Sequence, residues 1–91
     1  MEIAVKLKRP LVTLDLETTG TWIEKDRIIE IAMIRCLPDG TRQTYEQRIY
    51  PGIAIPADVT EVTGISDEDV RNCPRFREVA PGILAFINGA D

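Results

Sequence analysis

One stretch decides the fold of this chain: Leu11-Val12-Thr13-Leu14-Asp15-Leu16-Glu17-Thr18-Thr19-Gly20. The side chains of a β-strand alternate between its two faces, so Asp15 and Glu17 emerge together on one face. The other face carries Val12, Leu14 and Leu16 and can be buried. Because nearly every position leading to the acidic pair is apolar or small, we expect a central strand that is covered on both faces.

The acidic pair has the chemistry of a metal site. Two carboxylates this close repel each other, and a divalent cation relieves the repulsion. Carboxylate oxygens are the hard ligands that Mg²⁺ and Mn²⁺ prefer. The alternative is a solvated strand end that holds no ligand. Carboxylates at the end of a covered strand are costly unless something pairs with them. We therefore predict that Asp15 and Glu17 form half of a site for Mg²⁺ or Mn²⁺.

Length and composition indicate one small globular domain. The chain has 91 residues, of which 44 % are apolar and 29 % are charged. It has no apolar run of about 18 residues that could span a membrane, and its N-terminus lacks the pattern of a signal peptide. Two isolated cysteines suit the reducing cytoplasm. The net charge of −4 argues only weakly against a nucleic-acid partner, since bound metal ions invert the charge of an acidic cleft.

The apolar patterns predict an α/β arrangement of three strands followed by three helices. The strands are expected at about 11–17, 27–36 and 41–50 as an antiparallel meander, and the helices at about 57–63, 67–72 and 76–88. In the second strand, Ile29, Ile31 and Met33 are predicted to share one face. The turn signal Pro38-Asp39-Gly40 leads into the third strand, whose charged residues suit a sheet edge.

Local signals in the second half concern the ends and the packing of the helices. Gly64 is expected to end the first helix, and Ser66 with Asp69 to form a capping box, so the acidic residues 67–69 are interpreted as capping rather than metal ligands. Pro81 should kink or loosen the last helix. The apolar positions of that helix are predicted to pack against the sheet as core: Phe76, Val79, Ala80, Ile83, Leu84 and Ile87.

The stretch from Asp15 to Gly20 resembles the first motif of the DEDD (DnaQ-like) 3′–5′ exonuclease superfamily. Three further stretches agree in order and spacing: 27–32, 55–68 and the helix from Phe76. The resemblance implies an RNase H-like fold, a mixed sheet of five strands in which the second runs antiparallel to the rest. Residues 1–91 would then be the N-terminal part of one exonuclease domain, cut short before the later strands and the second and third motifs. One edge of the first strand would lie open.

The resemblance also implies an activity, the removal of nucleotides from nucleic-acid 3′ ends with two Mg²⁺ or Mn²⁺ ions. DNA is favoured over RNA, as in proofreading, with a DNA polymerase as partner. Asp15 would bridge both ions and Glu17 would hold the water-activating one. The family's third and fourth carboxylates and its general base, His or Tyr, would lie beyond Asp91, and the chain contains no histidine. We therefore expect the isolated chain to bind one ion weakly and to hydrolyse nothing at a useful rate.

Substrate contacts follow from the same resemblance. The segment formed by Leu16, Thr18, Thr19 and Gly20 would lie against the terminal nucleotide, although Gly20 also suits the backbone angles of a turn. Asp58 would accept from a ribose hydroxyl or cap its helix. Thr63 stands where many members carry histidine and could still donate a hydrogen bond. Glu30 is interpreted as a hydrogen-bond acceptor that supports the first motif, and Trp22 as a loop aromatic that packs on its own domain or stacks on a base.

Two other functions stay open at this point. The chain could be a non-catalytic nucleic-acid or protein interaction module that keeps the exonuclease sheet, and its open edge could pair with a second copy. A phosphotransfer enzyme of the Asp-x-Asp type fits poorly, because Glu17 replaces the second aspartate and the Thr-Thr-Gly context differs.

Overall fold

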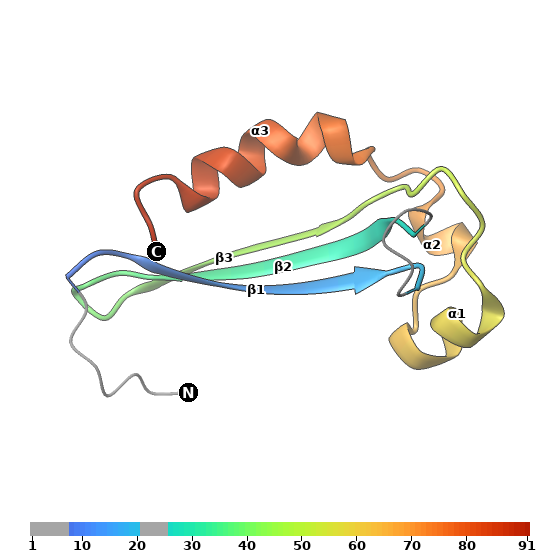
Figure 1. Ribbon diagram of the computed structural model, residues 1–91, viewed down its shortest axis with the longest axis horizontal. Coiled ribbons are helices and arrows are strands. Elements are labelled where there is room, and N and C mark those ends of the chain that lie inside the picture. Colours follow the sequence, from blue (N-terminus) through green and yellow to red (C-terminus); the bar gives the residue numbers. More distant parts are fainter. Residues whose placement is uncertain (1–7, 21–25) are drawn as a thin grey trace.

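A three-stranded sheet followed by three helices forms the molecule (Figure 1). The computed structural model describes residues 8–20 and 26–91, so Trp22 lies outside the described residues. The strands are β1 (Leu11–Thr18), β2 (Ile28–Cys36) and β3 (Arg42–Arg48), and the helices are α1 (Ala57–Thr63), α2 (Asp67–Val70) and α3 (Phe76–Ile87). The order of elements predicted from the sequence is confirmed, with ends that differ by up to two residues. None of these helices has the length and apolarity needed to cross a membrane.

The sheet has the order β1-β2-β3, and both pairs of strands are antiparallel. The predicted turn between β2 and β3 is present, with Gly40 at φ 90° and its N–H donating to the carbonyl of Leu37 over 2.9 Å. The hydroxyl and the N–H of Thr41 both donate to Asp39, which lowers the pKa of that carboxyl. Local turn chemistry therefore fixes the meander.

A register shift divides the sheet near the end of β1. Glu17 lies opposite Glu30, but Thr18 lies opposite Ile28, so Ile29 is one residue extra on β2. Ile29 packs in a separate cluster from Ile31 and Met33. All three side chains are buried and alternate with less buried neighbours along β2, in agreement with the predicted shared face.

The core consists of two clusters that lie at different places along the sheet. The first joins Ile29 to Ile55, Ile65 and Val70 from the α1–α2 region. The second lies between α3 and the sheet and contains Ile31, Met33, Ile49 and Val79. The helix α3 runs through Pro81 without ending there.

Parts of β1 and α3 that were predicted to be buried are exposed. Leu14 and Leu16 on β1 are 57 % and 39 % exposed, and Phe76 and Leu84 on α3 are 46 % and 64 % exposed. Within the described residues β1 is an edge strand, which corrects the expectation of a strand covered on both faces. The physical reason is that three strands are too few to cover both flanks of α3.

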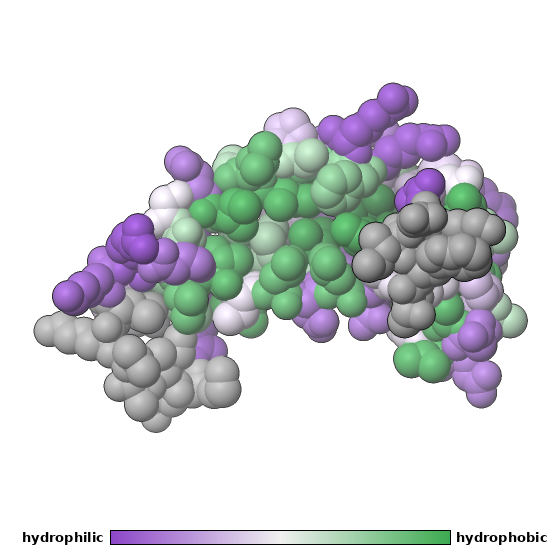
Figure 2. Space-filling model, in the orientation of Figure 1, coloured by the Kyte–Doolittle hydropathy of each residue, from purple (hydrophilic) through white to green (hydrophobic). Residues whose placement is uncertain are grey.

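The exposed side chains border an apolar groove of about 440 Å³ between β1 and α3. Its lining includes Leu14, Leu16, Phe76, Ile83 and Ile87. The space-filling view shows apolar side chains gathered over this region (Figure 2). A contiguous apolar surface of this kind on a small domain indicates an interaction site.

The residue Asp91 returns from α3 to the start of β1 (Figure 1). Its N–H donates to the carbonyl of Pro10 over 2.8 Å, and its carbonyl accepts from the N–H of Val12 over 2.9 Å. These two bonds bracket Leu11 in the way that a residue of one parallel strand brackets a residue of its neighbour. The guanidinium of Arg9 pairs with the carboxylate of Asp91 and holds this arrangement.

Candidate metal and nucleic-acid site

The strand β1 presents Asp15 and Glu17 on one face. Asp15 lies opposite Ala32 and Glu17 lies opposite Glu30 on β2. Asp15 is exposed and Glu17 is half-buried. Neither side chain has a hydrogen bond or an ion pair with any residue that the structure describes. The pair is therefore not neutralised within the described fold, and both carboxylates are available to a ligand.

The surface beside Asp15 is a shallow hollow of about 380 Å³. Its lining includes Asp15, Ala32 and Glu46, and Glu46 on β3 is the register partner of Ala32. Because alanine is small, Asp15 and Glu46 face the same hollow across it. However, the described residues contain no group of three His, Cys, Asp or Glu side chains that could hold a metal ion. Asp15 and Glu17 thus fit a metal as part of a ligand set, and they do not complete one.

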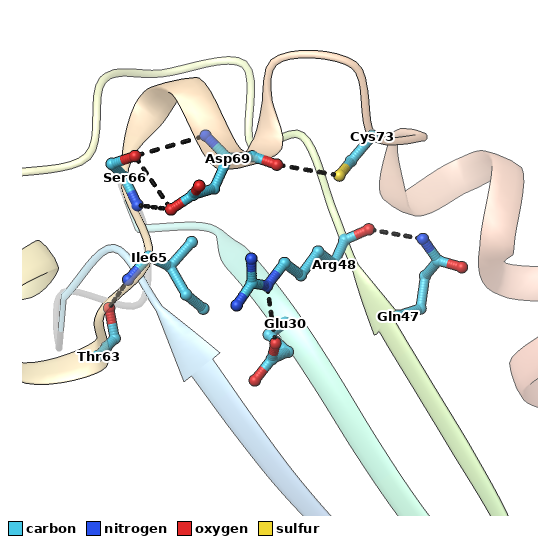
Figure 3. Close-up of polar contacts among 8 residues, drawn as sticks. All are labelled: Glu30, Gln47, Arg48, Thr63, Ile65, Ser66, Asp69 and Cys73. Atoms are coloured by element: carbon cyan, nitrogen blue, oxygen red, sulfur yellow. Dashed lines mark hydrogen bonds and ion pairs between the residues drawn. The ribbon is translucent and has the colours of Figure 1, made fainter.

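Glu30 is a hydrogen-bond acceptor, as predicted. Its carboxylate accepts a hydrogen bond from Nε of Arg48 on β3 over 3.1 Å (Figure 3). Its support of the first motif stays a prediction. Like charges directly opposite each other in a sheet are unfavourable, and Arg48 relieves the repulsion between Glu30 and Glu17. Glu30 therefore has a partner, whereas Glu17, which lies opposite it on β1, has none among the described residues.

The buried side chain of Thr19 stabilises the turn after β1. This side chain is 1 % exposed, and its hydroxyl donates to Oδ1 of Asp26 over 2.9 Å and accepts from the N–H of Arg27 over 2.9 Å. The N–H of Thr19 donates to the carbonyl of Arg27 over 2.8 Å. The hydroxyl of Thr18 donates to the carbonyl of Gly20 over 2.6 Å. The turn therefore has fixed geometry, and the side chain of Thr19 points inward rather than toward a ligand.

A side chain at position 20 would crowd the carboxylate of Asp26. A Cβ at Gly20 would lie 2.7 Å from Oδ2 of Asp26, which is closer than real Cβ contacts. The backbone of Gly20 is not in the left-handed region, so its predicted role in backbone angles is wrong. Sequence reasoning missed Asp26 altogether. The residue stands two positions before β2, where neither alternation nor a motif marks it.

The hydroxyl of Thr63 closes the end of α1 (Figure 3). It donates to the carbonyl of Val59 over 2.9 Å and accepts from the N–H of Ile65 over 3.1 Å. Gly64 follows with φ 77°, and its N–H donates to the carbonyl of Thr60 over 2.8 Å, which confirms the predicted helix end. A ligand contact from Thr63 would therefore compete with two bonds that define the turn.

Asp58 does not cap α1 by a hydrogen bond. The N-cap position belongs to Pro56, and α1 has no side-chain capping bond. Asp58 lies two residues further into the helix, past the position from which a side chain reaches the free N–H groups. The capping alternative for Asp58 is wrong in this form, and its contact with a ribose stays a prediction. Figure 1 shows α1 at the end of the sheet where β1 ends.

The acidic residues at the start of α2 serve the fold. Ser66 and Asp69 form the predicted capping box, with the carboxylate of Asp69 accepting from the N–H of Ser66 over 2.9 Å and from its hydroxyl over 3.0 Å (Figure 3). The N–H and then the hydroxyl of Ser66 lower the pKa of Asp69. Asp67 accepts from the N–H of Ile55 over 2.8 Å. The interpretation of these residues as structural rather than metal-binding is supported by their contacts.

Two carboxylates without partners among the described residues, next to a fixed turn, are typical of one class of protein. Proteins of this class hydrolyse phosphodiesters with divalent ions. The family model described as Exonuclease matches residues 12–91. The chain therefore belongs to the DnaQ-like (DEDD) 3′–5′ exonuclease superfamily.

Two relatives of known name are similar to most of this chain. The DNA polymerase III subunit epsilon of Treponema pallidum (strain Nichols) is 40 % identical over 75 residues, which cover 82 % of this chain and 35 % of that protein. The DNA polymerase III PolC-type of Caldanaerobacter subterraneus subsp. tengcongensis is 35 % identical over 89 residues, which cover 98 % of this chain and 6 % of that protein. The chain thus spans about one third of the first relative and far less of the second.

A crystal structure of exonuclease I is similar in fold. The superposition has a TM-score of 0.75 with 21 % identity and covers 90 % of this chain and 19 % of that one. This likeness confirms the RNase H-like fold class predicted from the sequence.

Proposed function

We propose that this chain supplies the metal-binding carboxylates and the first 3′-end contacts of a 3′–5′ exonuclease that hydrolyses phosphodiester bonds. One observation carries the proposal: Asp15 and Glu17 share a face of β1 and have no partner among the described residues, in a member of an exonuclease superfamily. Two neighbouring carboxylates on one strand face, with no cationic side chain beside them among the described residues, favour a bound cation. The ions would be Mg²⁺ or Mn²⁺, since these prefer oxygen ligands.

The residues of the chain would have distinct tasks at the site. Asp15 and Glu17 would hold the ions, Asp15 as the shared ligand. When bound, such ions activate a water molecule and stabilise the leaving oxygen of the phosphodiester. The turn at Thr18, Thr19 and Gly20 fixes the backbone next to the carboxylates, so that Leu16, Thr18 and Gly20 can lie against the terminal nucleotide.

The site needs groups from outside the chain, and the open edge of β1 is where we expect them to join. Val12 directs its N–H away from β2 toward Asp91. In an antiparallel ladder every second residue points the same way, so Leu14 and Leu16 also direct their backbone groups toward the open edge. Residues 1–91 would thus be the N-terminal part of the domain. Without a general base and further carboxylates, we expect the isolated chain to lack useful turnover.

DNA is the substrate we favour, and a DNA polymerase the partner. The support for both is that the two relatives are named as DNA polymerase III components. Pairing with a second copy through the open edge is less favourable. Two antiparallel β1 edges that meet near Asp15 would place like charges side by side.

The test is a titration of the chain with Mn²⁺ in which calorimetry measures the affinity. Wild type is expected to bind one ion weakly, and Asp15→Asn and Glu17→Gln to bind at least tenfold more weakly. Glu68→Gln is the matched control, because it removes the same charge from exposed α2. Equal affinity in all four proteins would remove the assignment of the site.

A protein-interaction module is the second candidate function, and the apolar groove favours it. In that case the groove and the open edge of β1 would bind an extended segment without any chemistry at Asp15. Two results together would support the module over the nuclease. Asp15→Asn would bind an extended apolar peptide as wild type does, and wild type would show no measurable Mn²⁺ binding.

A further inference from the structure

A second cleft lies where the end of β3 and the start of α3 meet the start of β2. Its volume is about 550 Å³, and its lining includes Arg27, Ile28, Tyr50, Arg75, Phe76 and Arg77. The N–H of Tyr50 donates to the carbonyl of Pro74 over 2.9 Å, which ties the segment after β3 to the segment before α3. We propose that this cleft binds the phosphate backbone of a single-stranded nucleic acid.

The charge of the cleft is opposite to that of the whole chain. Among the described residues, three arginines and one acidic residue, Asp26, line it, whereas the chain carries a net charge of −4. Neither Arg75 nor Arg77 has an ion pair with a residue of the described ranges 8–20 and 26–91. The carboxylate of Glu78 accepts from the backbone N–H of Arg75 over 3.2 Å, so it serves the helix end. Guanidinium groups without carboxylate partners are the usual ligands of phosphate.

Arg75 is held in place by an aromatic ring. Its guanidinium carbon lies 5.0 Å from the centroid of the Tyr50 ring, within the range of a cation–π contact. A guanidinium that is stacked on a ring loses less freedom when it binds phosphate. Hydrophilic side chains gather over the start of α3 in the space-filling view (Figure 2).

The cleft also offers an aromatic surface. The ring of Phe76 is nearly half exposed and stands between Arg75 and Arg77 in the sequence. Exposed aromatic rings beside cationic side chains are the usual arrangement for single-stranded nucleic acids, whose bases stack on the rings while the phosphates meet the charges. An inorganic anion would use the arginines alone, so Phe76 points to a nucleic acid.

The cleft and the carboxylate site share one end of the sheet. Ile28 lines the cleft and is the register partner of Thr18, which directly follows Glu17. Asp26 and Arg27, also in the lining, hold Thr19 in the turn. Ile28 and Phe76 also line the groove on the α3 face, opposite Asp15, so a strand whose 3′ end lies at Asp15 would pass around this end of the sheet to reach the cleft. This continuity rests on the proposed function, whereas binding in the cleft does not.

The test is fluorescence anisotropy with a 5′-labelled oligothymidylate in EDTA, which removes the cation site from the measurement. Arg75→Gln, Arg77→Gln and Phe76→Leu are each expected to bind more weakly than wild type. Each lost phosphate contact should also reduce the slope of log K against log salt by about 0.7. Arg71→Gln is the control, because Arg71 is exposed just after α2 and does not line the cleft.

The outcomes separate the cleft from the carboxylate site. Glu68→Gln removes a carboxylate outside both the cleft and the carboxylate pair, and should bind the oligonucleotide in EDTA as wild type does. The cleft proposal is overturned if wild type does not bind, if Arg71→Gln loses as much affinity as Arg77→Gln, or if an acidic peptide competes as well as the oligonucleotide. A failed Mn²⁺ titration with normal oligonucleotide binding would instead overturn the proposed function alone.

Discussion

Replacing Thr19 by valine tests how the turn that follows the carboxylates is held. The hydroxyl of Thr19 is the only part of the side chain that valine lacks, and it forms two hydrogen bonds inside the fold. One goes to the carboxylate of Asp26 and the other comes from the N–H of Arg27. The backbone bond between Thr19 and Arg27 is unaffected by the change.

The expected loss of stability follows from those two bonds. A neutral hydrogen bond contributes about 0.5–1.5 kcal/mol net, and one to a charged group about 1.5–3 kcal/mol. Valine fills nearly the same volume, so no cavity is added. The two contributions together give a reduction of about 2–4.5 kcal/mol in the free energy of unfolding. This is a large share of the stability of a small domain.

Urea unfolding followed by circular dichroism measures the change. Thr44→Val on β3 is the control, because Thr44 is exposed and its hydroxyl has no hydrogen bond to a described residue. Its free energy of unfolding should stay within about 0.5 kcal/mol of wild type. If Thr19→Val is as stable as Thr44→Val, the buried hydroxyl does not hold the turn, and the reasoning fails.

Two further predictions concern charges near the site. Arg48→Gln is expected to tighten Mn²⁺ binding about two- to fivefold, because Glu30 then adds its unneutralised charge next to Glu17. If calorimetry shows that Arg48→Gln binds Mn²⁺ as wild type does, Arg48 does not control the net charge next to Glu17. The pKa of Asp69 is lowered on folding by its bonds from Ser66, so its stabilising effect is full above the unfolded pKa and is lost as pH falls through the lower folded pKa. Urea unfolding should therefore show a difference in stability between wild type and Asp69→Asn at pH 7. The two proteins should converge in stability well below pH 3.8, the ordinary pKa of this carboxyl. A difference that does not shrink as pH falls would contradict the assignment.

Local chemistry explains what the sequence predicted correctly. The turn at Gly40, the helix end at Gly64 and the capping box of Ser66 and Asp69 are each formed by residues a few positions apart. Strand alternation placed Asp15 and Glu17 on one face for the same reason. Such features depend on residues whose spacing is visible in the chain.

Long-range geometry explains what the sequence did not show. The register shift after Glu17 depends on two strands at once. Asp26 accepts from Thr19 although it stands seven positions further along the chain, and it also approaches Gly20 closely. No pattern within either segment signals these contacts.

The wrong burial predictions for β1 and for α3 have a common cause. Leu14 and Leu16 on β1, and Ile87 on α3, all border the same apolar groove. The described fold leaves that surface open, and apolar residues in this pattern are those of a covered surface. The pattern therefore agrees with the proposal above that residues 1–91 are part of a larger domain.

The geometry of the open edge links completion of the sheet to completion of the site. A segment that continues in the direction set by Asp91 would run parallel to β1, with Leu11 as its first register partner. Its side chains opposite Leu14 and Leu16 would enter the apolar groove, and those opposite Thr13 and Asp15 would emerge on the carboxylate face. Covering the groove would therefore also bring new side chains beside Asp15. The free energy of burying apolar surface would then be available to hold like-charged ligands together around a cation.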